Sequence, residues 1–334
     1  MVIVNFSIVM GAEAMSGDSD GAGFLDLIAN SLHGRAAALF VVLAGVGLGL
    51  MGRKTLDAGF YVTQYKRAAF LLIIGLLNML IFDADILHYY ALYFAIGVWC
   101  LSLRSAALVG CIIALSALFV GLVLTLNYDA GWDWGTYSYS GFWTPSGFVR
   151  NLLFNGWHPV IPWLGFLLWG IILSRLNLRR HKTLIWLFIS HGFFFGFATL
   201  LSQGLMASIA PLDAEAALLF GTAPVPPMPL YIMAGGGAAG MAIALCLAIT
   251  PTLKRLGILP WLTRPGRQTL TLYVAHIYLG MGMLDVLGML GGQSIEQVML
   301  ASLLFCLACI LYAWAWNAYF KRGPLEALMR KLTG

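Results

Sequence analysis

Imidazole side chains are the groups in this sequence best suited to proton transfer, because histidine titrates near neutral pH. Three of them lie at the ends of hydrophobic segments: His33, His88 and His158. His191 and His276 lie deeper inside such segments, where an ionisable side chain is costly and indicates function. Together with Asp83, Asp85 and Asp26, the three terminal histidines predict a polar chamber that opens to the outside. For any single histidine, a structural role with satisfied hydrogen bonds is the alternative.

Metal and disulfide chemistry are not expected. No two histidines have the His-x₃-His spacing of ligands on a helix. All five cysteines lie inside hydrophobic segments or at the ends predicted to face the cytoplasm, so they form no extracytoplasmic disulfide framework. Cys306 and Cys309 form a CxxC on an apolar stretch, a position that favours packing over redox chemistry.

Three further features require a partner. Asn5 lies in an apolar stretch, so its amide needs a hydrogen-bond partner. Arg35 follows His33 by two positions and needs an anionic partner at that depth. The segment 127–158, which includes Trp157, is rich in aromatic residues. It is either an aromatic belt at the membrane surface or a platform against which a sugar ring could pack.

The elements that must position these residues are membrane-spanning helices. The mean hydropathy is +0.86, and only 10% of the residues are charged, against about 25% in soluble domains. The apolar runs are long enough to cross a hydrocarbon core of about 30 Å. They occupy residues 1–12, 35–52, 68–82, 86–103, 105–126, 160–178, 183–210, 228–250, 268–290 and 297–320. The sequence therefore predicts an all-α, polytopic integral membrane helical bundle of about ten helices, with residues 1–334 as a single domain.

Basic residues predict the orientation of these helices. If residue 1 is cytoplasmic and the spans alternate, 17 of the 19 Lys and Arg residues are cytoplasmic, and only Arg35 and Arg150 lie outside. Cytoplasmic loops carry such an excess, so both termini are predicted to be cytoplasmic. The first segment, 1–12, is expected to be a helix with a shortened cytoplasmic end. Because the charges are spread over short loops, no nucleic-acid partner is expected.

Two of the spans are rich in glycine. The span 35–52 contains AGVGLGLMG, and the span 228–250 contains AGGGAAG with Gly236 and Gly240 at GxxxG spacing. Small residues let helix backbones approach closely, so close packing is expected. A slot for a thin, extended ligand is the alternative.

Several stretches resemble, in order, the motifs of a known family. They are MVIVNF, LHGRAAALFVVLAGVGLGL, FDADILHYYALYFAIG, HPVIPWLGFLLWGIIL and RPGRQTLTLYVAHIY. These stretches resemble the transmembrane acyltransferase superfamily, which includes heparan-α-glucosaminide N-acetyltransferase and its bacterial relatives. The resemblance implies a cytoplasmic acyl-CoA donor and an acceptor on the other face of the membrane. It also implies that His33 is the catalytic histidine and that Asn5 supports it.

With this resemblance, the remaining residues acquire expected roles. Acetyl-CoA, the co-substrate, would bind its phosphates on arginines and extend past a histidine: Arg264, Arg267, Arg53, Arg67 and His276. The acceptor, an amino sugar or glycan, would be oriented on the outer side by five residues: Asp85, His88, His158, Trp157 and Arg35. His33 would act as general base. A covalent acyl-His33 intermediate stays open.

The resemblance also predicts the environment of the protein. We expect it in the cytoplasmic (inner) membrane of a bacterium, with the mouth of the active site facing outside. Membrane lipid and an extracytoplasmic sugar-like acceptor are the expected partners, and a homodimer is an open alternative. The competing function is a secondary transporter or channel for a small polar or amphipathic solute, although such proteins usually show repeats with broken helices in matching halves. The identity of the acceptor and the length of the acyl chain stay open.

Overall fold

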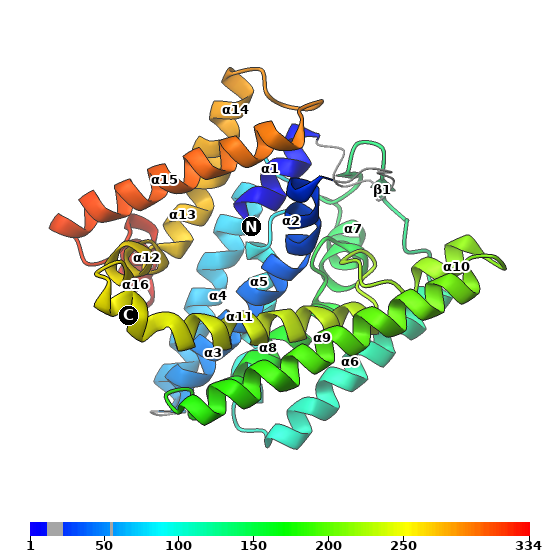
Figure 1. Cartoon of the computed structure of the whole chain (residues 1–334), viewed down its shortest axis with the longest axis horizontal. Coiled ribbons are helices and arrows are strands. Elements are labelled where there is room, and N and C mark those ends of the chain that lie inside the picture. The colour runs from blue at the N-terminus through cyan, green and yellow to red at the C-terminus, as the bar shows by residue number, and fades with distance from the viewer. Residues whose placement is uncertain (12–22, 54–55) are drawn as a thin grey trace. The chain divides into compact units, whose positions relative to one another are not determined.

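The computed structural model describes residues 1–11, 23–53 and 56–334. Lys54, one of the predicted cytoplasmic charges, lies outside this part. The chain forms two compact units, one comprising Met1–His33, Leu80–Phe82 and Ile249–Gly334 and the other Gly34–Met79 and Asp83–Ala248. Helices make up nearly all of the regular structure in the described residues (Figure 1). The predicted all-α class is confirmed.

The larger unit holds most of the long helices and one short hairpin. Its elements are α3 (Arg35–Gly52), α4 (Ala58–Asn78), α5 (Leu87–Cys100), α6 (Ser105–Thr125), β1 (Trp132–Asp133), β2 (Ser138–Tyr139), α7 (Pro145–Arg150), the π-helical turn η2 (Asn151–Asn155), α8 (Val160–Ser174), α9 (His181–Ile209), α10 (Ala214–Leu218) and α11 (Pro229–Arg255). The last turns of α11, from Ile249, belong to the smaller unit. The two strands pair antiparallel, with Trp132 opposite Tyr139.

The smaller unit combines the start of the chain with its end. Its elements are α1 (Val2–Met10), α2 (Phe24–Leu32), α12 (Leu259–Gly266), α13 (Thr269–Ala275), the π-helical turn η3 (His276–Met281), α14 (Gly282–Val286), α15 (Ile295–Tyr319) and α16 (Pro324–Thr333). Backbone bonds from Gly291 to Val9 and from Gln293 to Met10 tie α1 to the turn before α15. The carboxylate of Glu326 accepts the N–H groups of Leu270 and Thr271 and so binds α16 to the first turn of α13.

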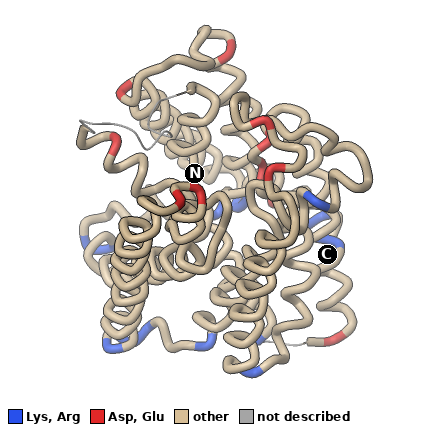
Figure 2. Tube along the Cα trace, turned by 90° about the vertical axis from the view of Figure 1, so that its right-hand side faces the viewer, with Lys and Arg blue, Asp and Glu red and all other residues tan. Residues whose placement is uncertain are grey.

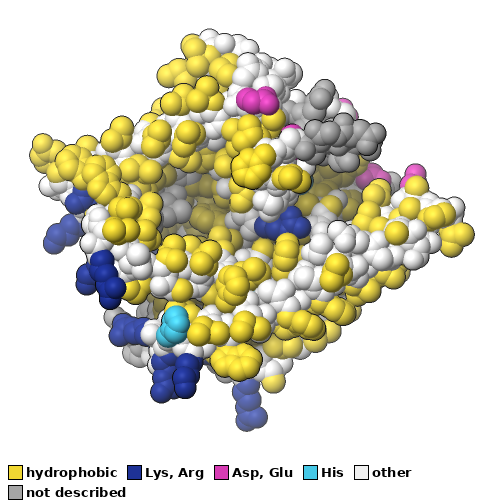
Figure 3. All heavy atoms as spheres, in the orientation of Figure 1, with side chains coloured by type: hydrophobic (Ala, Val, Ile, Leu, Met, Phe, Trp, Pro, Cys, Tyr) yellow, Lys and Arg dark blue, Asp and Glu magenta, His cyan; other side chains and the backbone are white. Residues whose placement is uncertain are grey.

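Seven helical segments in the described residues are long and apolar enough to cross a membrane, or eight if the pair Pro145–Asn155 and Val160–Ser174, bent by 49°, is one span. The predicted count of about ten is therefore too high. Every predicted span contains a helix, but α1 has only nine residues and α5 only 14. At 1.5 Å per residue these helices reach about 14 and 21 Å, which is short of the hydrocarbon core. Hydrophobic side chains cover much of the face shown in Figure 3, as expected for contact with lipid.

One predicted boundary is wrong. The helix predicted at 68–82 begins at Ala58, where the Asp57 side chain caps it by accepting the N–H of Phe60 at 2.7 Å. Lys66 and Arg67 therefore lie within α4 and not in a loop. The span predicted at 35–52 is confirmed, because α3 runs from Arg35 to Gly52. Hydropathy locates the apolar part of a helix, whereas caps decide where it ends. Figure 2 shows Lys and Arg mainly near helix ends and turns.

Glycines bring the backbones of α3 and α8 together. A Cβ atom on Gly45 would lie 2.0 Å from the carbonyl oxygen of Leu167, and one on Gly170 would lie 2.0 Å from that of Val42. Neither distance is possible for a real side chain, so both positions require glycine. The expectation that the Gly-rich span 35–52 packs closely is confirmed.

The glycines of α11 divide between two roles. A Cβ atom on Gly240 would overlap the ring of His191 on α9, and one on Gly237 would lie 2.8 Å from the carbonyl oxygen of His191. A Cβ atom on Gly236 would meet nothing within 4 Å, and this residue lines an apolar cavity of about 570 Å³ between α6, α8, α9 and α11. The His191 ring accepts the Trp169 indole N–H at 3.1 Å and faces the Leu187 carbonyl oxygen with its other nitrogen at 2.9 Å. This histidine therefore has the structural role that the sequence left open.

The contrast between two glycines of α3 gives a test of this packing. We expect Gly45→Ala to destabilise the protein by about 1–3 kcal/mol or more, because the added methyl group overlaps backbone that cannot move aside. A Cβ atom on Gly47, by contrast, would meet nothing within 4 Å. Gly47→Ala should therefore be neutral, or stabilising by up to about 1 kcal/mol from helix propensity. Thermal unfolding of the purified proteins in detergent measures both changes, and equal effects would contradict the assigned packing.

Candidate active site

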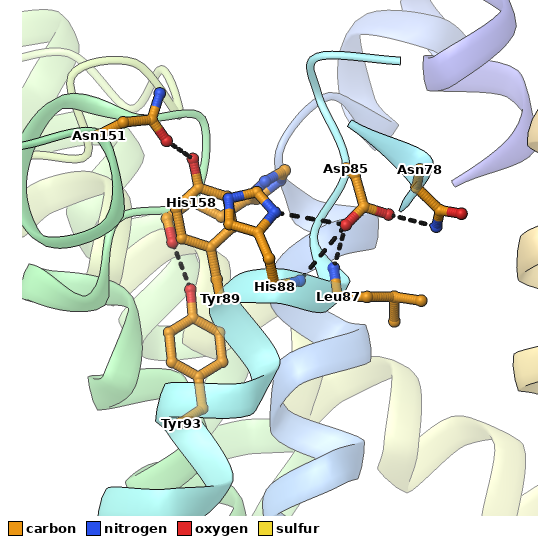
Figure 4. Close-up of polar contacts among 8 residues, drawn as sticks. All are labelled: Asn78, Asp85, Leu87, His88, Tyr89, Tyr93, Asn151 and His158. Atoms are coloured by element: carbon orange, nitrogen blue, oxygen red, sulfur yellow. Dashed lines mark hydrogen bonds and ion pairs between the residues drawn. The ribbon is translucent and has the colours of Figure 1, made fainter. Parts of the chain in front are cut away.

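A buried carboxylate, Asp85, organises the turn between α4 and α5 (Figure 4). Its Oδ1 accepts the side-chain N–H of Asn78 at 2.8 Å, and its Oδ2 accepts the backbone N–H groups of Leu87 at 2.7 Å and His88 at 3.4 Å. The N–H groups of a first helical turn have no partners within the helix. Asp85 therefore caps α5 from two residues before its start, through donors that are uncharged.

The same carboxylate faces the ring of His88. Nδ1 of His88 lies 3.4 Å from Oδ2 of Asp85, and both side chains are fully buried. The ring packs against Tyr89, with centroids 3.8 Å apart, and edge-on to Phe142 at 5.7 Å. Nε2 of His88 is buried and has no hydrogen-bond partner among the described residues. The sequence therefore predicts correctly that Asp85 and His88 lie together.

The ring of His158 also contacts the ring of Tyr89. The Tyr89 and His158 rings meet edge-on at 5.8 Å, and the Tyr93 hydroxyl donates to the backbone carbonyl of His158 at 2.5 Å. The Tyr89 hydroxyl donates to Oδ1 of Asn151 at 2.6 Å. These bonds join α5 to η2 and to the segment that leads into α8. The Tyr89 ring thus contacts both His88 and His158, and Figure 4 shows the three side chains next to one another.

The aromatic segment folds over this region as a hairpin. Trp132 and Trp134 stack at 4.5 Å with an interplanar angle of 12°, and Trp157 meets Trp132 edge-on at 5.3 Å. Trp157 is buried, and its indole nitrogen has no hydrogen-bond partner among the described residues. Burial raises the pKa of Asp83, although a hydrogen bond from the backbone of Tyr139 opposes this shift. The platform for a sugar ring stays a prediction.

Three buried asparagines were not predicted from sequence, namely Asn78, Asn151 and Asn155. Asn155 donates to the carbonyl oxygens of Tyr128 and Ala130 at 2.7 and 2.9 Å and accepts the Tyr139 hydroxyl at 2.9 Å. The signal that could have found Asn78 and Asn155 is an amide within an apolar run, LLNML and LLFNGW, because such a group needs partners.

Asn5 and His276, both in the smaller unit, hydrogen-bond each other. Nδ2 of Asn5 lies 2.8 Å from Nε2 of His276, and Nδ1 of His276 contacts the Tyr273 carbonyl oxygen. Both side chains are buried. Asn5 thus has the partner that its position requires, and that partner is His276. His33 is the C-cap of α2 and half-buried, and the support of His33 by Asn5 stays a prediction.

The predicted arginines are distributed over both units. In the larger unit, Arg35 lies over the Phe195 ring at 5.4 Å, and Nη1 of Arg67 lies 3.3 Å from Sδ of Met51. In the smaller unit, Arg264 lies over the Trp314 ring at 5.7 Å. Arg264 belongs to the last turn of α12, and Arg267 lies in the short turn before α13.

A groove with a basic end runs between the two Gly-rich helices of the larger unit. Its volume is about 860 Å³. Leu39, Leu43, Val46 and Leu50 of α3 form one wall, and Ala242, Ile243, Cys246 and Leu247 of α11 form the other. Arg53, Arg175 and Arg179 lie at one end, next to the turn after α8. Nη2 of Arg53 donates to the carbonyl oxygen of Ser174.

The three arginines at this end are not equivalent. Arg175 donates to the Ser105 hydroxyl and to the carbonyl oxygens of Leu101 and Leu103, so its guanidinium binds the end of α5 to the start of α6. All three are exposed, and each guanidinium has five N–H donors. Arg175 uses two of its nitrogens within the protein, whereas the structure shows one such bond from Arg53 and none from Arg179 in the described residues. Arg53 and Arg179 are therefore the better candidates to bind an anion. No group of three or more His, Cys, Asp or Glu side chains suited to a metal ion occurs in the part of the chain that the structure describes.

The role of Asn155 can be tested by its removal. Asn155→Ala leaves two carbonyl groups and one hydroxyl without their partner, and each unsatisfied buried group costs about 1–3 kcal/mol. We expect a clear fall in the thermal unfolding midpoint of the protein in detergent. Asn127→Ala, at an exposed position whose side chain accepts only the N–H of Asp129, is the matched control and should change it little. Equal shifts in the two variants would show that Asn155 does not hold the loop.

Comparison with known families gives two matches. The model of the heparan-α-glucosaminide N-acetyltransferase catalytic domain matches residues 1–207. The model of a family described as protein of unknown function (DUF418) matches residues 172–334. No curated protein and no solved structure matches the chain. The first match contains His33, Asp85, His88 and His158, whereas His276 and the arginines at 264 and 267 lie in the second.

Proposed function

Because the chain belongs to the heparan-α-glucosaminide N-acetyltransferase catalytic-domain family, as its motifs indicate, we propose that it is a membrane-embedded acyltransferase. It moves an acetyl group from cytoplasmic acetyl-CoA to an amine or hydroxyl group of a sugar-like acceptor outside the cytoplasmic membrane of a bacterium. The observation that carries the donor half of this proposal is the groove between α3 and α11, with its basic end and apolar walls.

The groove suits the two chemically different halves of acyl-CoA. Guanidinium groups bind phosphate with charge-assisted, bidentate hydrogen bonds, and Arg53 and Arg179 lie at the end that the charge pattern predicts to be cytoplasmic. The thin pantetheine arm would lie along the apolar walls that α3 and α11 form. The glycines of these two helices do not line the groove, so a slot formed by the glycines themselves stays a prediction. Binding roles for Arg67, Arg264, Arg267 and His276 stay predictions.

The donor site can be tested by removing Arg53 and Arg179. Arg53→Ala combined with Arg179→Ala should weaken the binding of CoA by about 10- to 100-fold, because hydrogen bonds to charged groups contribute about 1.5–3 kcal/mol. Isothermal titration calorimetry on the detergent-purified protein measures the affinity. Arg180→Ala is the matched control, since Arg180 is an exposed neighbour that does not line the groove. Unchanged affinity in the double variant would move the donor site to Arg264 and Arg267.

The resemblance assigns the base to His33, and this assignment is part of the proposal. Removal of a general base typically lowers the rate by about 10²–10⁴-fold. We expect His33→Ala to lose acetyl transfer and to retain CoA binding. Wild-type activity should rise with pH through about 6 to 7, because only the neutral imidazole accepts a proton. Transfer of radiolabelled acetyl groups, normalised to folded protein, measures both effects, and a variant that keeps most of its specific activity would remove His33 from the mechanism.

A transporter is the second candidate, and one observation favours it. The pair Pro145–Asn155 and Val160–Ser174 has the form of a broken span, and discontinuous helices commonly form substrate sites in transporters. CoA binding separates the two candidates. A transporter would give no calorimetric signal with CoA and would accumulate solute in proteoliposomes without it.

A further inference from the structure

Asp85 and His88 form a buried pair in which Nδ1 of the ring faces the carboxylate and Nε2 has no partner among the described residues. Burial alone disfavours a charged imidazole. Here, however, a carboxylate lies 3.4 Å from Nδ1, so a proton added at Nε2 converts a buried anion and a neutral ring into a neutral ion pair. Nε2 itself has no hydrogen-bond partner among the described residues. A carboxylate that holds one nitrogen of an imidazole and leaves the other for the reactant is the arrangement of base and orienting group in acyl-transfer enzymes.

The surroundings of the ring contain few competing charges. Uncharged groups contact it directly, namely Tyr89 on α5 and Phe142 after the hairpin. The titratable or charged groups of α5 and of the elements around it include Tyr89, whose hydroxyl is bonded to Asn151, Tyr90 and Tyr93, also on α5, and His158, which contacts Tyr89. They also include Tyr128 after α6, Asp83 before α5, Tyr139 with the Arg150 guanidinium that donates to its hydroxyl, and Arg35 at the start of α3. Asp85 is the one charged side chain that the described residues place in contact with the His88 ring.

The loops around this pair favour a cationic ligand. The segments 79–86 and 126–159 contain four aspartates, Asp83, Asp85, Asp129 and Asp133, and a single basic residue of fixed charge, Arg150. A site lined by one sign of charge raises the local concentration of the opposite ion. Of the two acceptor types in the proposed function, an amine is cationic near neutral pH and a hydroxyl is not.

We infer that His88, positioned by Asp85, accepts the first of the two protons that an amine acceptor must lose during acetyl transfer. This inference rests on the proposed function. The ammonium ion R–NH₃⁺ gives one proton to Nε2 of His88, and the free amine then attacks the thioester. The C–N bond forms and the C–S bond breaks. The second proton leaves the nitrogen and ends on the CoA sulfur as a thiol. His88 returns its proton to the solvent, so one proton is released per turnover.

This role differs from a structural one in its dependence on pH. At low pH almost all of the acceptor is ammonium, so loss of His88 should slow transfer strongly. At high pH the solution itself supplies free amine, and the same loss should matter less. A histidine that only supports the fold would lower activity by the same factor at every pH.

The experiment compares acetyl transfer to glucosamine between pH 6 and pH 9 in detergent-purified protein. His88→Gln should lower kcat/KM by about 100-fold or more at pH 6, and by a factor at least ten times smaller at pH 9. Asp85→Asn should show the same trend, because the ring would lose the carboxylate that compensates its charge. His181→Gln, at an exposed histidine that begins α9, is the matched control and should leave the profile unchanged.

Other outcomes overturn the inference. An equal loss at all pH values in a folded His88→Gln protein would assign His88 a structural role, and no loss would exclude it from proton transfer. CoA binding, measured first by calorimetry, distinguishes failure of the proposed function from failure of this inference.

If the wild type transfers no acetyl group, ¹⁵N-histidine NMR tests the inference directly. The His88 signal is identified as the one that is absent from the spectrum of His88→Gln. This signal must change from neutral to protonated imidazole when glucosamine is added at pH 7, and an unchanged signal would overturn the inference.

Discussion

Backbone polar groups inside a membrane must find partners within the protein, because lipid offers none. Regular helices meet this demand by themselves, but their breaks do not. In the larger unit, buried side chains satisfy backbone groups at the start of α5 and in the loop after α6. Asp85 accepts the first N–H groups of α5, and Asn155 donates to two carbonyl groups of the loop after α6. The candidate site therefore lies where helices end and buried polar side chains form hydrogen bonds with backbone groups that have no partner within a helix.

The close packing of α3 against α8 fixes the elements around this site. Glycine at 45 and 170 lets the two backbones touch, and α8 in turn packs against α5 and α6. A similar requirement holds between α4 and α5, where a Cβ atom on Gly75 would lie 2.2 Å from the backbone nitrogen of His88. The position of the His88 ring relative to Asp85 is therefore set by backbone contacts, which move less readily than side chains.

The sequence predicts the helical class and the approximate place of each span, because apolar runs carry that information. It fails at helix ends, as Lys66 and Arg67 within α4 demonstrate, because caps and interfacial turns are polar. It places Asp85 beside His88 because three positions separate them along the chain. It could not pair Asn5 with His276, since 271 positions lie between them and only tertiary packing brings them together. Asn155 was detectable as an amide in an apolar run, although its three partners were not.

The charge of the site connects binding with proton transfer. Asp85 is fully buried, and the amide of Asn78 and the two backbone N–H groups that donate to it carry no charge. A buried carboxylate favours a positive charge placed beside it. That positive charge can be an ammonium group near the pair or a proton on the His88 ring. When the proton moves from the ammonium group to the ring, the amine is deprotonated. In the proposed reaction, the same carboxylate would attract a cationic acceptor and would help to remove the proton that prevents its nitrogen from attacking a thioester.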